Sequence, residues 1–242
     1  KQELESSRIH RLGHLRAWQR ETLRLQPNLV PQISSVIVID LDLLTLPLPS
    51  ALASASESVG AIGGEDVVCA NGHESWLLLR HYYDSFALVL NDGTWAFPLL
   101  TSVKSIFFLL QHNFYRKVSS HYPGNYPVKS CFGGLAVYRA DKWFEPRCNY
   151  EIEPMPDDLA MTLNAYRNAN GEVCEHVVFH MCLAENSDGG ELKIGIKPDM
   201  DLSRDANIGG GNNPTLIYAL LAAGFSFCVW RTVGCQWRSE EP

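Results

Sequence analysis

The period of the hydrophobic positions changes several times along the chain, and each change predicts an element. Residues 4–25 repeat apolar side chains three to five positions apart among many charges, which predicts an amphipathic helix ended by Pro27. Residues 36–39 are all β-branched and predict a strand buried on both faces. The helical period returns in residues 101–119, and alternation over residues 193–196 predicts another strand. Together these periods predict an α/β fold.

Runs of small residues interrupt these periods. Ser and Ala dominate residues 50–60, which follow Pro47 and Pro49, and glycines continue the run to Gly64. We expect a loop here, beside the end of the first strand, in the position that lids commonly take. Residues 198–214 are rich in Gly and Asn and predict a second, longer loop that covers a site or is disordered.

The length of 242 residues allows one large domain or two small ones. We expect one domain over residues 1–200, followed by a C-terminal loop and apolar segment over residues 201–242. The apolar run Leu216–Trp230 is interrupted by Gly224 and is short for a bilayer, which needs about 20 residues. It predicts either a buried helix or strand pair, or a membrane or interfacial segment.

Composition places the chain among globular proteins, with 46% hydrophobic and 19% charged residues. The net charge of -7 argues against a general nucleic-acid binder, whose affinity needs a basic face. A nucleotide ligand is compatible with this charge if a divalent ion offsets it. The first residue is Lys1, and no signal-peptide pattern follows it, so we expect a fragment or a processed form.

The chain has seven cysteines and no CxxC pair, which argues against a structural zinc site of the ribbon type. The odd number leaves at least one thiol free. One or two disulfides are compatible with the sequence, and the first pairing to test is Cys148 with Cys174. The cysteines therefore do not decide between an oxidising and a reducing cellular compartment.

The predicted strand at residues 36–39 stops at two carboxylates one residue apart, Asp40 and Asp42. Open α/β sheets bind ligands at the carboxyl ends of their strands. Two carboxylates there predict a site for Mg²⁺ or Mn²⁺, and such an ion holds a diphosphate. A solvated turn is the alternative, although Ile39 and Leu41 flank the acids and make an unpartnered charge costly.

A second informative stretch is residues 128–138, a strand-forming segment that contains Gly133 and Gly134. Paired glycines mark close approach by a ligand or by another backbone, and a bulge without a ligand is the alternative. The arginines of residues 8–24 allow two readings as well. They form a solvated face of ion pairs, or one of them reaches the phosphates of a nucleotide, with Arg16 the candidate.

A third stretch is Cys174–His180, where we expect a helix to begin near Glu175. An acid at a helix start is favourable to the helix dipole, so a capping role for Glu175 is one reading. His176 and His180 lie four positions apart and share a helix face. Such a pair binds a metal or packs in the core, and the spacing alone does not decide between these roles.

The order of these stretches resembles a known family. Asp-x-Asp after a hydrophobic strand, then Tyr82-Tyr83-Asp84, then Ser130–Arg139, then Cys174-Glu175-His176 look like a glycosyltransferase with the GT-A fold. The nearest group is the fungal cryptococcal-type α-1,3-mannosyltransferases, and the resemblance covers residues 8–200. It implies a GT-A-like, Rossmann-like mixed sheet flanked by helices in a single domain. It also implies a nucleotide-sugar donor, a glycan or other hydroxyl acceptor, and Mn²⁺ or Mg²⁺ as the cofactor.

The resemblance also implies roles for individual residues. The metal would be held by Asp40 and Asp42, with His176 or His180 as a further ligand. Glu175 would orient the acceptor hydroxyl, or act as a base if the enzyme inverts. Gly133 and Gly134 would line the sugar or acceptor side of the cleft, and Asp84 would contact the donor sugar. In a eukaryote the implied setting is the Golgi lumen or its membrane, and otherwise the cytoplasm.

The sequence also departs from the family. It begins at the helix before the Asp-x-Asp strand, so we expect the family's N-terminal nucleotide-binding strand either to be lacking from the fold or to lie outside this sequence. No histidine follows His180 to serve as a late metal ligand. Two rival functions follow from these residues: a non-catalytic or degenerate glycan- or nucleotide-binding domain, and a haloacid-dehalogenase-type phosphatase with Asp40 as nucleophile. The phosphatase pattern wants Thr or Val where this chain has Leu44.

Overall fold

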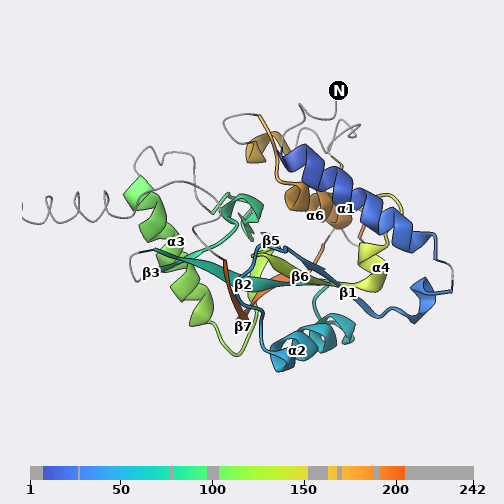
Figure 1. The fold of residues 1–242 in the computed structure, drawn as a ribbon, viewed down its shortest axis with the longest axis horizontal. Coiled ribbons are helices and arrows are strands. Elements are labelled where there is room, and N and C mark those ends of the chain that lie inside the picture. Colours follow the sequence, from blue (N-terminus) through green and yellow to red (C-terminus); the bar gives the residue numbers. More distant parts are fainter. Residues whose placement is uncertain are drawn as a thin grey trace, which may run out of the picture. The chain divides into compact units, whose positions relative to one another are not determined.

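The structure is a computed structural model that describes residues 8–26, 28–76, 79–96, 104–151, 163–167, 171–187 and 191–204. These residues belong to one compact unit, residues 1–205 (Figure 1). The predicted apolar segment Leu216–Trp230 and the predicted loop beyond Arg204 lie outside the described residues. No helix within the described ranges is both long enough and apolar enough to cross a membrane.

A seven-stranded mixed sheet forms the centre of this unit. Its order is β1-β6-β2-β7-β5-β4, with β3 paired to β2. The pairs are antiparallel except for β2 with β7, which are parallel. The strands are β1 (Ser35–Ile39), β2 (Val67–Trp76), β3 (Leu79–Tyr82), β4 (Val89–Leu90), β5 (Tyr126–Ser130), β6 (Leu135–Arg139) and β7 (Ile194–Arg204).

Helices flank this sheet, so the prediction of a single α/β domain with a mixed sheet is confirmed. In Figure 1, α1 and α6 lie on one side of the sheet and α2 lies on the other, while α3 runs beside β3. The α-helices are α1 (Arg8–Arg24), α2 (Pro49–Gly60), α3 (Lys104–Ser119), α4 (Ala140–Trp143) and α6 (Glu175–Glu185). Short 3-10 turns are η2 (Val30–Gln32), η3 (Ser85–Ala87) and η4 (Asn164–Tyr166).

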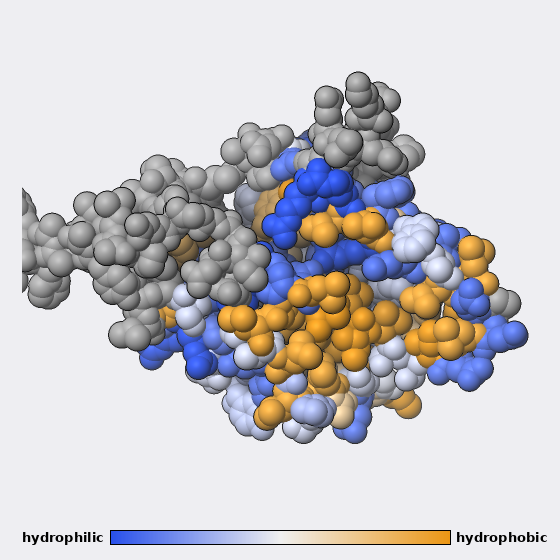
Figure 2. Space-filling view, in the orientation of Figure 1, coloured by the Kyte–Doolittle hydropathy of each residue, from blue (hydrophilic) through white to orange (hydrophobic). Residues whose placement is uncertain are grey.

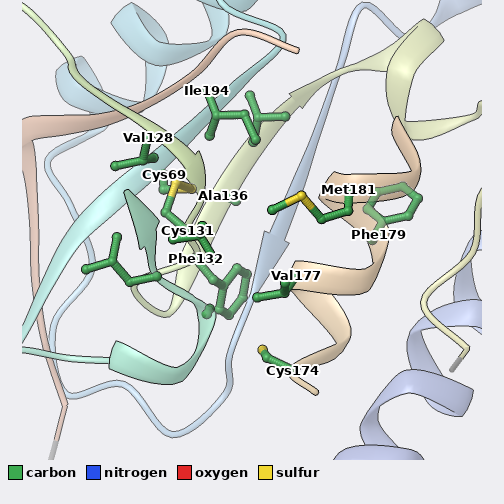
Figure 3. Packing of buried hydrophobic residues seen from close by; sticks show 14 of the residues in the cluster. Cys69, Val128, Cys131, Phe132, Ala136, Cys174, Val177, Phe179, Met181 and Ile194 are labelled. Atoms are coloured by element: carbon green, nitrogen blue, oxygen red, sulfur yellow. A yellow bond between two sulfur atoms is a disulfide. The ribbon is translucent and has the colours of Figure 1, made fainter. Parts of the chain in front are cut away.

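The alternation of side chains along β2 divides the core in two. Val67 and Cys69 belong to the larger core, whereas Val68 and Ala70 belong to a smaller core under α2. In the larger core, Val177 of α6 points toward Phe132 at the sheet (Figure 3). Both faces of β2 are therefore covered, which is what a central strand needs.

The prediction of a loop over residues 50–60 is wrong, because Pro49–Gly60 forms helix α2. Ala51, Ala55 and Val59 recur every four residues and are buried in the smaller core. Alanine is the strongest helix former, and proline is tolerated in the first turn of a helix. These small residues therefore pack on the sheet and do not form a lid.

The prediction that β1 is buried on both faces is also wrong. β1 pairs with β6 alone among the described strands and so forms an edge of the sheet. Val36 and Val38 pack against the larger core, but Ile37 and Ile39 are 46% and 37% exposed. Helix α2 packs mainly over β6, β2 and β7 and so leaves these two side chains exposed. Figure 2 shows an apolar surface between α1 and α2.

The predicted loop from Pro198 begins too early, because β7 continues to Arg204. The register of β7 against β2 shifts there, so that Ala70 pairs with Lys197 but Asn71 pairs with Asp201. Such a bulge accommodates a proline inside a strand. The strand therefore extends past residue 200, the predicted end of the domain.

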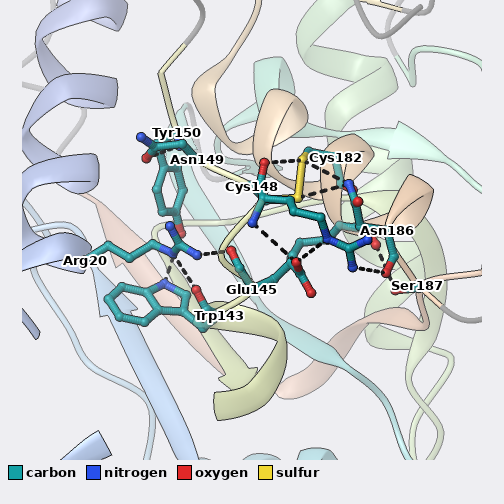
Figure 4. Close-up of a disulfide and its surroundings, with 11 residues drawn as sticks. Arg20, Trp143, Glu145, Cys148, Asn149, Tyr150, Cys182, Asn186 and Ser187 are labelled. Carbon is teal, nitrogen blue, oxygen red and sulfur yellow. Dashed lines mark hydrogen bonds and ion pairs between the residues drawn. A yellow bond between two sulfur atoms is a disulfide. The ribbon is translucent and has the colours of Figure 1, made fainter. Parts of the chain in front are cut away.

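Two disulfides lie within the described residues, Cys69–Cys131 and Cys148–Cys182. The predicted pairing of Cys148 with Cys174 is wrong, since Cys174 is a free, buried thiol at the start of α6. Cys182 lies two turns further along the same helix, and the spacing in the sequence did not distinguish the two. Figure 4 shows the Cys148–Cys182 bond beside Asn186, whose amide nitrogen donates to both sulfur atoms at 3.5 Å.

Candidate functional site

A cavity of about 190 Å³ lies where the end of β1, the start of α6, the end of β7 and helix α1 meet. Five residues predicted from the sequence line it: Arg16, Asp40, Asp84, Glu175 and His176. The remaining lining residues are Arg8, Ile9, Leu12, Tyr83, Phe86, Phe132, Cys174 and Arg204. Segments up to 196 residues apart in the sequence thus meet at one place.

The glycine pair holds the end of β1 in position. Gly133 and Gly134 form the turn between β5 and β6 with φ of +62° and +86°, values that favour glycine. A Cβ on Gly133 would overlap the carbonyl oxygen of Ala70, and the carbonyl of Gly134 accepts a 2.9 Å hydrogen bond from the backbone N–H of Asp40. The close approach predicted here is therefore by another backbone, and neither glycine is among the residues that line the cavity.

Arg16 of α1 joins two of the acidic side chains. Its Nη2 donates a 2.9 Å hydrogen bond to Oδ1 of Asp40, and its Nη1 forms an ion pair with Oε1 of Glu175. The guanidinium also lies 4.9 Å from the centre of the Phe132 ring. Because all three polar groups are largely buried, the arginine compensates carboxylate charge that would otherwise be costly.

Asp42 has a different partner from Asp40. Arg204, at the end of β7, contacts Oδ2 of Asp42 through Nε at 2.9 Å and Nη2 at 2.6 Å. Its Nη1 lies 3.2 Å from Oε1 of Glu74, and its guanidinium stacks over Tyr83. Arg204 lines the cavity, whereas Asp42 is not among the lining residues.

Sequence reasoning missed Arg204 and the role of Tyr83. Arg204 fell in a segment predicted to be irregular, and nothing local linked it to the aspartates. Tyr83 belongs to one of the stretches that carry the resemblance, and its hydroxyl donates a 3.2 Å hydrogen bond to Oδ2 of Asp40. The tyrosine next to Asp84 was therefore the available signal.

Two carboxylates in the cavity hold protons more tightly than usual. Burial raises the pKa of Asp40, although the charge of Arg16 opposes this shift. Burial, followed by the negative charge of Asp40, raises the pKa of Asp84 to about 7. Asp84 also has a left-handed backbone with φ of 62°, which Asp tolerates better than most residues. A carboxyl group with a pKa near neutrality suits general acid–base chemistry.

The two histidines occupy different positions. His180 is fully buried, with Nδ1 2.9 Å from the Ser130 hydroxyl and Nε2 3.0 Å from the Tyr138 hydroxyl. Burial lowers the pKa of His180 to about 3, so the ring is neutral. Both ring nitrogens have hydrogen-bond partners, so His180 has no free nitrogen for a metal. It occupies the core role that was one of the two alternatives in the sequence analysis.

His176 stacks on Phe132, with 3.8 Å between the ring centres. Its Nδ1 lies 3.3 Å from the Tyr138 hydroxyl, and its buried Nε2 has no hydrogen-bond partner in the part of the chain that the structure describes. His176 lines the cavity, but no group of three or more His, Cys, Asp or Glu side chains within the described ranges is placed to hold a metal.

Glu175 is the first residue of α6 and is 4% exposed. An acid at this position is favourable to the helix dipole, and the same side chain also lines the cavity. The thiol of Cys174 donates to Oε2 of Glu175 at 3.6 Å. Burial raises the pKa of Cys174 to about 12, so this thiol stays protonated and is a poor nucleophile.

The contacts of Asp40 and Asp42 leave some of their carboxylate lone pairs unused. Each oxygen of Asp40 accepts one hydrogen bond, and both bonds from Arg204 fall on a single oxygen of Asp42. A carboxylate oxygen has two lone pairs, so coordination positions are left on both residues. Mg²⁺ commonly takes only one or two carboxylates and completes its shell with water and phosphate oxygens.

Comparisons of the chain with family models, with characterised proteins and with solved structures gave no match. The class that the described residues define is a single α/β domain with a mixed sheet and an acidic, arginine-containing cavity at the end of its edge strand.

Proposed function

We propose that this protein is a metal-dependent glycosyltransferase of the GT-A type, which moves a sugar from a nucleotide-sugar donor to a hydroxyl acceptor. One observation carries the proposal: Asp40, Asp84 and Glu175 come from three separate stretches of the resemblance and line the same cavity. A structural role for each stretch alone would not require these acids to meet.

In this proposal the donor diphosphate binds between the arginines and the aspartates. Arg16 and Arg204 supply guanidinium groups suited to phosphate oxygens. Asp40, which lines the cavity, and Asp42, two positions further along the chain, would hold Mn²⁺ or Mg²⁺, and the charge of the ion would favour departure of the nucleoside diphosphate. The donor phosphates would replace part of the carboxylate–arginine pairing that the structure contains.

The remaining acids act on the acceptor. Glu175, fixed by Arg16, orients the acceptor hydroxyl. The hydroxyl oxygen bonds to the anomeric carbon while the bond from that carbon to the phosphate oxygen breaks, and Asp84 takes the hydroxyl proton. Asp84 lines the same cavity as Glu175, and its burial raises its pKa, which suits a proton acceptor.

The test is hydrolysis of a panel of nucleotide sugars, measured as release of the nucleoside diphosphate. We expect one or a few donors to be hydrolysed with Mn²⁺ or Mg²⁺, and no hydrolysis after chelation. If no donor is hydrolysed and neither UDP nor GDP binds in the presence of Mn²⁺, the proposal is rejected.

A second function has a specific observation in its favour. Both aspartates are already paired with arginines, and the described residues supply no third metal ligand beside them. These facts suit a non-catalytic domain that binds a glycan or nucleotide without a metal. Binding of UDP or GDP that is equally strong with Mn²⁺ and with chelator, together with no hydrolysis, would favour this function.

A further inference from the structure

The outer edge of β1 presents backbone groups that no described strand uses. The backbone N–H of Asp40 donates to the carbonyl of Gly134 at 2.9 Å, so the residues with even numbers along this strand exchange hydrogen bonds with β6. The N–H and C=O groups of Ser35, Ile37 and Ile39 therefore point away from β6. No strand within the described ranges pairs with that side of β1.

The β1 edge also lacks the features that commonly prevent an edge strand from pairing with another chain. These features are lysine or proline in the strand, a bulge, or a very short strand. At the opposite edge of the sheet, β4 has only two residues and an irregular register with β5. By contrast, β1 has five residues, a regular register with β6, and the sequence Ser-Val-Ile-Val-Ile, without charge or proline.

Apolar side chains are exposed beside this edge. Those between residues 29 and 48 that are 37–97% exposed are Leu29, Ile37, Ile39, Leu41, Leu44, Leu46 and Leu48. The leucine turn, residues 41–48, is fixed to the end of β7, because Leu44 N–H donates to the Ser203 carbonyl at 2.8 Å. The backbone N–H of Ser203 donates in return to the Thr45 hydroxyl at 2.8 Å. The leucines are therefore held in their exposed positions.

The exposed area matches one side of a protein–protein interface. Burial of a whole Leu or Ile side chain removes on the order of 100 Å² of apolar surface from water, so these side chains together expose on the order of 400 Å². Because interfaces between separable proteins are about 57% non-polar, this corresponds to about 700 Å² in total. Standard interfaces bury about 800 Å² on each partner.

A second copy of the chain fits this surface, because antiparallel pairing of β1 with itself is self-complementary. With a two-fold axis at Ile37, all of β1 overlaps, and each outward N–H meets a carbonyl of the other copy. Ile39 then lies opposite the smaller Ser35, and the two Asp40 residues are roughly 20 Å apart along the strands. The leucine turn of one copy lies toward Leu29 of the other, since the strands run in opposite directions.

We propose that two copies of this chain form a dimer by antiparallel pairing of β1 about a two-fold axis at Ile37, with the leucine turn of each packing on the other. The net charge of -7 on each chain opposes the association, so the dimer is reversible and is strengthened by salt. None of its contact residues lines the cavity, so the inference does not depend on the proposed function.

Sedimentation velocity of the full chain over a range of concentrations measures the association. We expect a dissociation constant of about 1–100 µM, since interfaces of this size include micromolar ones. Ile37→Lys places two ammonium groups together at the axis and should raise this constant at least about tenfold. Leu46→Lys leaves β1 unchanged and should raise it about threefold to tenfold. The matched control is Leu109→Lys on α3, where the leucine is 54% exposed, and it should have no effect.

Hydrogen exchange of single amides, followed by NMR, locates the contact on the strand. As the protein concentration rises, exchange at Ile37 and Ile39 should slow at least about threefold, because pairing protects their amides only in the dimer. Exchange at Val36 and Val38 should change little, since these amides are already bonded to β6. Packing through the side chains alone would not produce this alternation.

Any of three results would overturn the dimer. The chain may sediment as a monomer at every concentration, or neither Ile37→Lys nor Leu46→Lys weakens association more than Leu109→Lys does. The third result is exchange at Ile37 and Ile39 that does not depend on concentration. Fast exchange of that kind would place the contact elsewhere, and slow exchange would mean that other residues of the same chain cover the edge.

Discussion

Arg204 holds Asp42 through two contacts to the same carboxylate oxygen, at 2.9 Å and 2.6 Å, across 162 residues of sequence. The last described residue of β7 thereby fixes the turn that follows β1. A second arginine, Arg16, holds Asp40 in a comparable way from α1. The geometry of the Asp-x-Asp pair is thus set by two distant segments, and each can be tested separately.

Replacing Asp42 by alanine should abolish metal-dependent donor hydrolysis while the fold is kept. The Asp42 carboxylate is one of the two proposed metal ligands, and Arg204 keeps Glu74 as a partner when Asp42 is absent. Hydrolysis assays with Mn²⁺ and circular dichroism measure the two effects. The control is Asp141→Ala, which removes another arginine-paired aspartate, that of Arg139, outside the cavity. Full activity of a folded Asp42→Ala protein would refute the metal role.

Arg16→Met should lower the free energy of unfolding by about 3 kcal/mol, because it leaves two buried carboxylates without their cation. Chemical denaturation measures this change. Arg24→Met provides the comparison, since Arg24 pairs with Glu21 at the surface, where such pairs contribute about 0–1 kcal/mol. Equal effects of the two substitutions would show that Arg16 does not neutralise the cavity.

Asp84→Asn should stabilise the protein more as the pH rises. In the folded chain the pKa of Asp84 is about 7, and in the unfolded chain it is about 4. Its contribution to stability is therefore fully present below pH 4 and is lost as the pH rises to about 7. Asparagine does not ionise, so the melting temperature of the variant minus that of the wild type should grow across this window and then stay constant.

Thermal unfolding at pH 4, 5.5, 7 and 8 gives this difference directly. Asp92→Asn is the control, because hydrogen bonds from Thr94 lower the pKa of Asp92. Its difference from the wild type should change only below about pH 4. A difference for Asp84→Asn that is flat from pH 4 to 8 would mean that Asp84 ionises normally.

Peptide mapping without reduction should recover Cys69–Cys131 and Cys148–Cys182, with Cys174 alkylated only after unfolding. Replacing both Cys148 and Cys182 by alanine should lower stability by about 3–4 kcal/mol, the chain-entropy value for a 34-residue separation. Cys174→Ala serves as the comparison and should have a much smaller effect. Recovery of a Cys148–Cys174 peptide would contradict the structure.

Local patterns predicted the type of several elements but not their environment. Four β-branched residues identified β1 as a strand. Its edge position follows from pairing with β6 on one side only among the described strands, and residues 36–39 carry no signal of that pairing. Residues 50–60 were misread because their small side chains suggested a loop. The four-residue spacing of Ala51, Ala55 and Val59 was present in the sequence and gives the helix.

Only part of the candidate site was predicted, because contacts between distant segments leave no local pattern in the sequence. Asp40, Asp84 and Glu175 were identified from their stretches, and the structure brings them to one cavity. The sequence did not predict that Asp42 would pair with Arg204, or that both nitrogens of His180 would be satisfied in the core. Ion pairs between residues more than 100 positions apart leave no periodic signal.

The edge position of β1 has a consequence for how this site would respond to a ligand. A strand with hydrogen bonds on one side only opens by local fraying more readily than a central strand. Such fraying would carry Asp40 away from Arg16, so the site and the strand would loosen together. Deuterium uptake at the amides of residues 36–40 would then slow when a ligand bridges the two aspartates, whereas uptake in the central strand β2 would hardly change.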